Sequence, residues 1–153
     1  MTFCLKLCFR FPLFVVSALI FGGEPIAAVS RTLPYTASTV AVPVLKSSVN
    51  DAGQSIRYPR DGTAEVTMLR VKIPPGKTTG WHTHPVPGFA YILSGTLTVV
   101  MRDGRQIPFS AGQGFAESVD LPHNGKNLGT APVDLVVVFL GKKGHSFVVK
   151  SEP

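Results

Sequence analysis

Short runs of β-prone residues, separated by turn residues, fill most of the second half of the chain. Residues 65–73 alternate between apolar and polar side chains, and residues 133–140 form a longer apolar, β-branched run. Between them the apolar runs stop at Ser94-Gly95, Asp103-Gly104 and Ala111-Gly112. Turn signals thus recur about every ten residues, and no apolar repeat of about 3.6 residues extends far enough to predict a helix. The pattern predicts an all-β sandwich or barrel.

The predicted barrel domain occupies residues 63–150, and an arm precedes it. Residues 29–62 are polar and rich in turns, with a candidate edge strand over residues 40–45. Such a segment can pair with the edge of a sheet in its own chain or in a second copy. We therefore expect an N-terminal arm or edge strand, and strand exchange through it would make the protein a homodimer.

Residues 1–28 have the features of a secretory signal peptide. A positively charged start precedes an apolar run over residues 11–22, and small residues follow that run. We expect cleavage after Ala28 or after Ser30. No second apolar segment of spanning length follows, so we expect no stable membrane span once this leader is removed. The pattern predicts an exported protein, periplasmic or extracellular; the alternative is an uncleaved N-terminal anchor.

Composition narrows the classes of function. Both cysteines, Cys4 and Cys8, lie in the predicted leader, so the mature chain would have no disulfide and no thiol nucleophile. The formal charge is +6 at pH 7, but the basic residues are scattered along the chain. Nucleic-acid binders carry a basic stripe or a recognisable reader motif, so we expect no nucleic-acid partner. No nucleotide-binding glycine loop is present either.

His82, His84 and His123 are the candidate metal ligands. On a strand the side chains alternate between faces, so His82 and His84 point the same way, about 7 Å apart along the strand. His123 begins a later predicted strand. Three imidazoles on adjacent strands would hold one divalent ion and leave positions open for other ligands. Imidazole suits iron, manganese, zinc, nickel and copper to differing degrees, so the ligand set does not name the metal.

Two stretches around these histidines resemble the two motifs of the cupin family. The first stretch has the spacing G-x5-H-x-H-x3-G-x6-G and contains Gly76, His82, His84, Gly88 and Gly95. The second has the spacing G-x5-S-x-D-x2-H-x3-N and contains Gly112, Ser118, Asp120, His123 and Asn127. The resemblance covers residues 64–141. It implies a jelly-roll β-barrel that binds a metal through the three histidines, with turn glycines at 95 and 112.

Gly88 is the main departure from the family pattern, because the family has a metal-binding glutamate there. Either the site works with three histidines, as in cupins that resemble thiol and diketone-cleaving dioxygenases, or it has lost tight metal binding. Small residues at Gly88 and Ala90 predict room beside the metal for a substrate or a water molecule. Glu117 is an alternative ligand, although a hydrogen bond or a surface ion pair is the expected role for a glutamate at a strand end.

The resemblance implies a metal-dependent enzyme, of which a dioxygenase acting on a small organic molecule is the leading interpretation. The alternative is a non-catalytic cupin that binds a small ligand and whose metal site is structural or vestigial. A sugar isomerase or epimerase would need an acid–base pair in the barrel, and the residue pattern assigns none. No catalytic residue is therefore assigned, and the choice of function rests on analogy within the family.

Overall fold

The computed structural model describes residues 38–152, and the compact unit that contains the sheets begins at Ala41. The predicted signal peptide, residues 1–28, and the beginning of the arm lie outside the described residues. Over residues 38–152 every regular element is a strand, which confirms the all-β prediction. A search of this part of the chain for helices long and apolar enough to cross a membrane found none.

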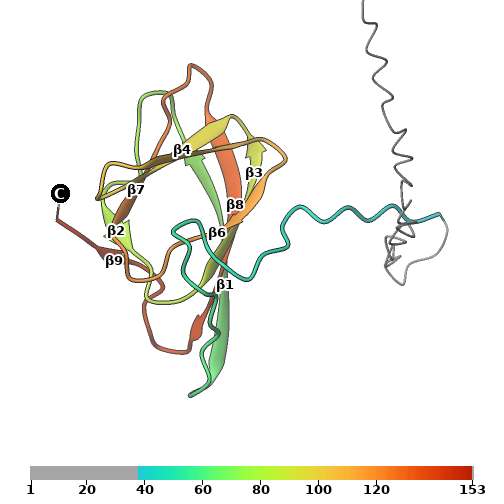
Figure 1. The fold of residues 1–153 in the computed structure, drawn as a ribbon, viewed down its shortest axis with the longest axis vertical. Coiled ribbons are helices and arrows are strands. Elements are labelled where there is room, and N and C mark those ends of the chain that lie inside the picture. The colour runs from blue at the N-terminus through green and yellow to red at the C-terminus, as the bar shows by residue number, and fades with distance from the viewer. Residues whose placement is uncertain (1–37, 153) are drawn as a thin grey trace, which may run out of the picture. The chain divides into compact units, whose positions relative to one another are not determined.

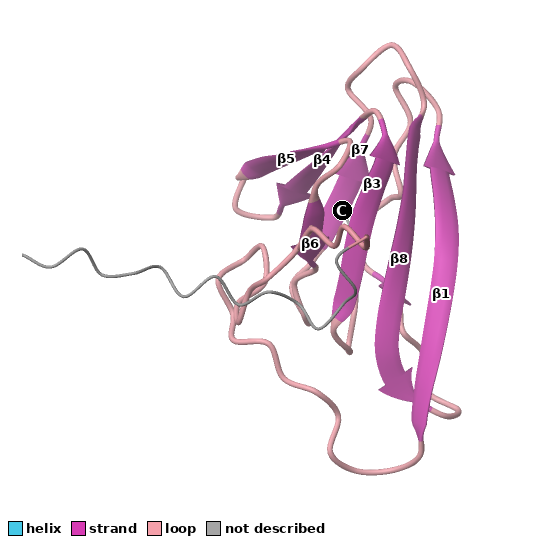
Figure 2. Cartoon of the chain, turned by 90° about the vertical axis from the view of Figure 1, so that its right-hand side faces the viewer, coloured by secondary structure: helices cyan, strands magenta, loops and turns pink. Residues whose placement is uncertain are grey.

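The strands form two antiparallel sheets that face each other across the barrel interior (Figure 1). The first sheet has the order β1-β8-β3-β6, made of β1 (Ala64–Ile73), β8 (Val133–Lys142), β3 (Gly88–Ser94) and β6 (Gly114–Ala116). The second has the order β5-β4-β7-β2-β9, made of β5 (Gln106–Ser110), β4 (Thr96–Met101), β7 (His123–Lys126), β2 (His82–Thr83) and β9 (Val149–Lys150). In Figure 2, β1, β8 and β3 stand side by side as the tallest wall of the barrel.

Alternation along β1 and β8 builds the core. Leu69, Val71 and Ile73 of β1 point inward, whereas Arg70 points outward and makes a bidentate ion pair with Asp134 of β8, at 3.0 and 2.7 Å. The inward residues of both sheets pack together because each strand turns every second side chain to the same face. The buried core consists of Ile73, Val86, Ala90, Ile92, Leu97, Val99, Met101, Phe115, Val133, Leu135, Val137 and Phe139.

Two turns near the candidate ligands depend on left-handed backbone. Gly95 joins β3 to β4 with φ of 77°, and a Cβ there would lie 2.8 Å from the carbonyl oxygen of Pro132, so only glycine fits. Asp120 has φ of 56°, which makes it the one non-glycine residue with positive φ between residues 38 and 152. Aspartate tolerates this conformation better than most residues, and the Asp120 N–H donates to the carbonyl of His84 at 2.9 Å.

From Ala41 on, the arm contacts its own barrel at several points, although residues 41–44 are exposed. Where an edge strand was expected over residues 40–45, the structure has one hydrogen bond, from the Gly114 N–H to the carbonyl of Val44 at 3.2 Å. Pro43 has no N–H to donate, which works against regular pairing there. Further on, the Gln54 side chain bonds both the N–H and the carbonyl of Val119, at 2.9 and 3.0 Å. Strand exchange between two copies stays a prediction.

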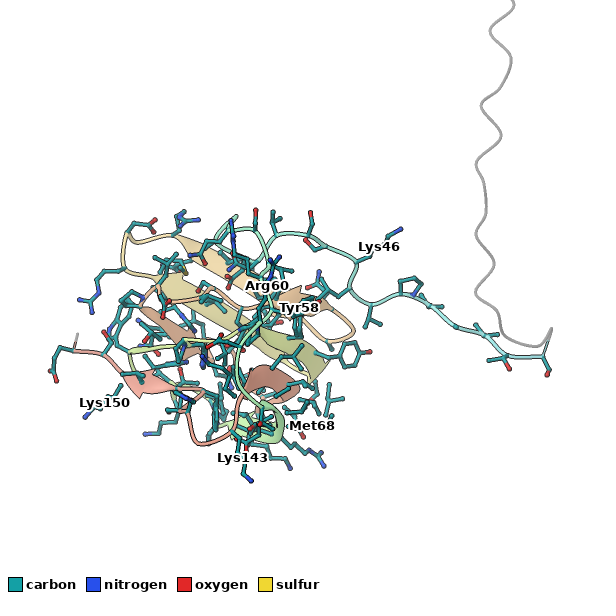
Figure 3. The ribbon with its side chains drawn as sticks, turned by 90° about the horizontal axis from the view of Figure 1, so that it is seen from below. Lys46, Tyr58, Arg60, Met68, Lys143 and Lys150 are labelled. Atoms are coloured by element: carbon teal, nitrogen blue, oxygen red, sulfur yellow. The ribbon has the colours of Figure 1, made fainter. Side chains whose placement is uncertain are left out.

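Basic side chains are spread over the surface of the barrel. Figure 3 shows Lys46, Lys143 and Lys150 extending from the ribbon in different directions, and all three are exposed. A single-sign patch of the kind that binds a polyanion needs such side chains gathered on one face. The spread agrees with the scattered basic residues of the sequence, and the absence of a nucleic-acid partner stays a prediction.

Candidate metal centre

The three predicted histidines come together in the barrel interior. His82 of β2 lies directly opposite His123 of β7, and His84 follows β2 by one residue. One ligand atom from each of the three lies within 4.8 Å of the others, and the ring centroids are 4.5 to 5.2 Å apart. His84 and His123 are buried, and His82 is half-buried. The structure thus brings together all three residues that the sequence singled out.

Backbone carbonyls fix the orientation of each imidazole ring. The Nδ1 atom of every one of the three histidines lies 2.8 Å from a carbonyl oxygen. The carbonyls belong to Gly80 for His82, to Phe147 for His84 and to Leu121 for His123. A carbonyl only accepts, so Nδ1 carries a proton in each ring, and Nε2 of a neutral ring keeps its lone pair. Metal-binding histidines use this arrangement, in which a second group holds the ring nitrogen that does not touch the metal.

The donor set fits a cation. Burial lowers the pKa of His82, and it also lowers the pKa of His123, so both rings are neutral near pH 7. Neutral rings of this tautomer offer only acceptor lone pairs at Nε2. Clustered, buried lone pairs without a donor are costly, and a divalent ion removes that cost. The residues present therefore could hold one metal ion.

Glu117 contributes a carboxylate to the same site. Its Oε2 lies 2.7 Å from Nε2 of His84, and its side chain is only 12% exposed. Burial by itself raises the pKa of Glu117, but the hydrogen bond and the charge of His84 outweigh it and leave the pKa below its ordinary value. Burial lowers the pKa of His84, yet the bond to Glu117 and its charge raise it overall. Of the two expected roles, a hydrogen bond or a surface ion pair, the structure shows the hydrogen bond, at a largely buried position.

Phe139 fills the space beside Gly88. A Cβ at Gly88 would lie 2.6 Å from Cε1 and 2.9 Å from Cδ1 of Phe139, which faces Gly88 from β8. The same ring packs against the ring of His84 at a centroid distance of 4.5 Å and against Phe147 at 5.0 Å. The prediction of free room at position 88 is therefore wrong, because an aromatic side chain of the neighbouring strand occupies it.

A cavity of about 920 Å³ adjoins the histidines inside the barrel. Its wall is mainly apolar and aromatic, with Leu69, Val71, Leu97, Val99, Phe115 and Val137 among the lining residues. Charged side chains are few and include Asp51, Glu117 and Lys150. Pockets of this size and character bind small molecules, with a few polar groups that set orientation.

Asp51 is a site residue that the sequence did not indicate. The arm loop carries it to the cavity, where its N–H donates to the carbonyl of Ala116 at 2.9 Å. Burial, and then the charge of Glu117, raise the pKa of Asp51 to about 6. Its Oδ1 is buried and has no hydrogen-bond partner. In the sequence Asp51 stands in Asn-Asp-Ala-Gly, an ordinary turn composition that carries no signal of a site.

Comparisons with known proteins agree with this architecture. The Cupin domain family, Cupin_2, matches residues 69–139, a span that includes the three histidines. A crystal structure from Klebsiella pneumoniae, of an uncharacterized conserved protein with a double-stranded β-helix domain, is 18% identical with a TM-score of 0.50. The match covers 71% of this chain and 100% of that chain. A search of curated proteins gave no match.

Two further solved structures are enzymes by description. One is a chain from the crystal structures of the DMSP lyases RdDddP and RnDddQII; it is 22% identical with a TM-score of 0.49, over 57% of this chain and 44% of that chain. A predicted oxalate decarboxylase from Thermotoga maritima is 27% identical with a TM-score of 0.43, over 48% of this chain and 64% of that chain. This chain thus spans less than two thirds of either. The family match and the barrel shared with the Klebsiella protein confirm the predicted fold, and residues 69–139 are identified as a cupin domain.

Proposed function

We propose that this protein binds one divalent transition-metal ion through Nε2 of His82, His84 and His123 and acts with it on a small, largely apolar molecule. The observation that carries the proposal is the common orientation of the three rings. Each donates Nδ1–H to a backbone carbonyl and turns Nε2 toward the same small volume. Packing alone does not account for three separate hydrogen bonds from Nδ1 to backbone carbonyls, since a ring that is only packed needs no particular tautomer.

The chain's own residues divide the work in this proposal. A bound ion supplies a Lewis acid and, when it is a redox metal, an electron route for reaction with oxygen. The three histidines hold and orient that centre. The apolar wall around Phe115 and Val137 binds the substrate and keeps bulk water away. Asp51 Oδ1, buried without a partner, is placed to take up or release a proton at the cavity.

Within this proposal the reaction class is an oxidation by molecular oxygen. Its support is the resemblance of the three-histidine motif to dioxygenase cupins, and imidazole ligands suit the redox metals iron and copper as well as zinc and nickel. Measurements of oxygen uptake with a panel of small apolar substrates test the class. Metal-dependent uptake supports it, and ligand binding without turnover favours the non-catalytic small-ligand barrel instead.

Elemental analysis by mass spectrometry tests metal binding itself. The protein is purified without a polyhistidine tag, beside a His82→Ala/His123→Ala variant. We expect about one equivalent of a divalent metal per chain and its loss in the variant. Iron, manganese or copper would point to oxygen chemistry, and zinc or nickel to other roles. Absence of metal in both proteins after reconstitution with each ion would overturn the proposal.

Export of the mature chain is part of the proposal. Its support is the charged start, the apolar run and the small residues that end near Ala28 and Ser30. The mass of the protein recovered from the periplasmic or culture fraction gives the cleavage point directly. A full-length chain retained in the membrane fraction would favour the uncleaved anchor.

A further inference from the structure

The carboxylate of Glu117 reaches the candidate site from a neighbouring strand, in the same cross-strand row as Gly88. In the β3–β6 pair, Phe89 faces Ala116, and continuing this register by one residue sets Gly88 opposite Glu117. The Glu117 N–H donates to the carbonyl of Gly88 at 2.9 Å, which extends the pairing beyond β6. Residues directly opposite each other in an antiparallel pair turn their side chains to the same face. Glu117 therefore enters the barrel from the same face as position 88.

Phe139, on the opposite side of Gly88 in this cross-strand row, explains why no carboxylate stands at position 88. Gly88 also faces Phe139 of β8, and the aromatic ring leans over the glycine. Across the three strands the row reads Phe139, Gly88, Glu117. A side chain at 88 has no room, whereas the side chain of Glu117 contacts His84.

The contacts of the Glu117 carboxylate are those of a ligand-forming group. Its Oε2 lies 2.7 Å from Nε2 of His84, the atom that the Phe147 carbonyl leaves as an acceptor. In the metal-free protein a proton joins these two atoms as a hydrogen bond, and a metal ion that both atoms coordinate would replace that proton. Among the described residues, no lysine or arginine forms an ion pair with Glu117. The carboxylate is thus largely buried, and its ion-pair partner among the described residues is His84.

We infer that Glu117, which directly follows β6 and lies opposite Gly88 of β3, supplies a fourth, oxygen ligand to the proposed metal site. This inference rests on the proposed function. It changes the predicted donor set from three nitrogens to three nitrogens and one oxygen. That set carries one negative charge, so it binds a divalent ion more tightly than three neutral imidazoles do.

A titration of Co²⁺ into the metal-free full chain, followed by calorimetry and visible absorption, tests the inference. The variants are Glu117→Gln, which keeps the shape and removes the charge, and His123→Ala. Glu65→Gln, at an exposed glutamate of β1, is the matched control. We expect one Co²⁺ per chain in the wild type and in the control. In Glu117→Gln we expect affinity lower by about 10- to 100-fold or more, and a changed Co²⁺ spectrum because one ligand has changed.

The outcomes separate this inference from the proposed function. Wild-type affinity and spectrum in Glu117→Gln, with binding abolished in His123→Ala, would refute the fourth ligand and leave the three-histidine site standing. Weaker binding with an unaltered Co²⁺ spectrum would make Glu117 a positioning residue that acts through His84, and would also overturn the inference. Failure of the wild type to bind Co²⁺, Zn²⁺ or Fe²⁺ would overturn the proposed function and this inference with it.

Discussion

A methyl group at position 88 is expected to destabilise the barrel, because Phe139 already occupies the space. The Cβ of Gly88→Ala would lie 2.6 and 2.9 Å from two ring carbons of Phe139, against about 3.5–4.0 Å for a comfortable carbon–carbon contact. The ring must therefore shift by roughly 1 Å. It is 3% exposed and is held between the rings of His84 and Phe147, so it has little space to move into. Overpacking of this kind costs about 1–3 kcal/mol.

A double-mutant cycle isolates the contact. Phe139→Leu alone should cost less than the roughly 3–5 kcal/mol of a Phe→Ala truncation, because leucine keeps part of the packing. In the double variant the methyl group at 88 enters space that the smaller side chain has vacated. We expect the two substitutions to couple favourably, by about 1 kcal/mol or more.

Urea unfolding of the metal-free proteins measures these free energies, since a change of midpoint at constant slope reports stability alone. Gly141→Ala is the control, because its Cβ would meet Val86 at an ordinary 3.8 Å and should change the free energy of unfolding by only about 0.5–1 kcal/mol. If Gly88→Ala proves as stable as Gly141→Ala, or if the two costs simply add in the double variant, the packing argument for the missing glutamate is refuted.

Three further substitutions and one measurement on the wild type test other parts of the structure. Asp51 has a folded-state pKa of about 6 against an ordinary 3.8, so the folded protein binds more protons than the unfolded chain between these values and loses stability as pH rises through them. Glu117 and His84 are the charged neighbours of Asp51. Asp51→Asn removes this pH dependence, so between pH 4 and pH 7 its free energy of unfolding in urea should rise by about 1–2 kcal/mol relative to that of the metal-free wild type. Parallel curves of stability against pH for the two proteins would contradict this. Asn127 is 1% exposed; its side chain donates to the carbonyls of Ile73 and Ala131 and accepts from the N–H of Gly129. Asn127→Ala should therefore lower the stability measured by thermal unfolding by about 3 kcal/mol or more. A loss under about 1 kcal/mol would show that these backbone groups find other partners. Asp120 has positive φ, so Asp120→Val should be less stable than Asp120→Gly by about 1–3 kcal/mol, and equal melting temperatures would contradict the strained backbone there. Sedimentation equilibrium of the wild type checks the predicted homodimer, which a monomer at all concentrations would rule out.

Local patterns in the sequence were sufficient for the fold class and for the three histidines. The alternation over residues 65–73 and the glycine at a sharp turn such as Gly95 are local signals in the sequence. They predict strands and turns without any knowledge of which strands will pair. His82 and His84 share a face because they are two residues apart on one strand. The spacing that resembles the cupin motifs then linked His123 to them, and the structure places all three together.

Only the tertiary structure decided which other side chains reach the histidines. Glu117 enters the site because β6 pairs with β3 in a register that sets it opposite Gly88, and Phe139 closes position 88 from the other neighbouring strand. Asp51 arrives from a loop of the arm that is distant in sequence. The identity of a cross-strand neighbour depends on register and sheet order, which arise from packing of the whole barrel, and no periodicity within a single strand encodes it.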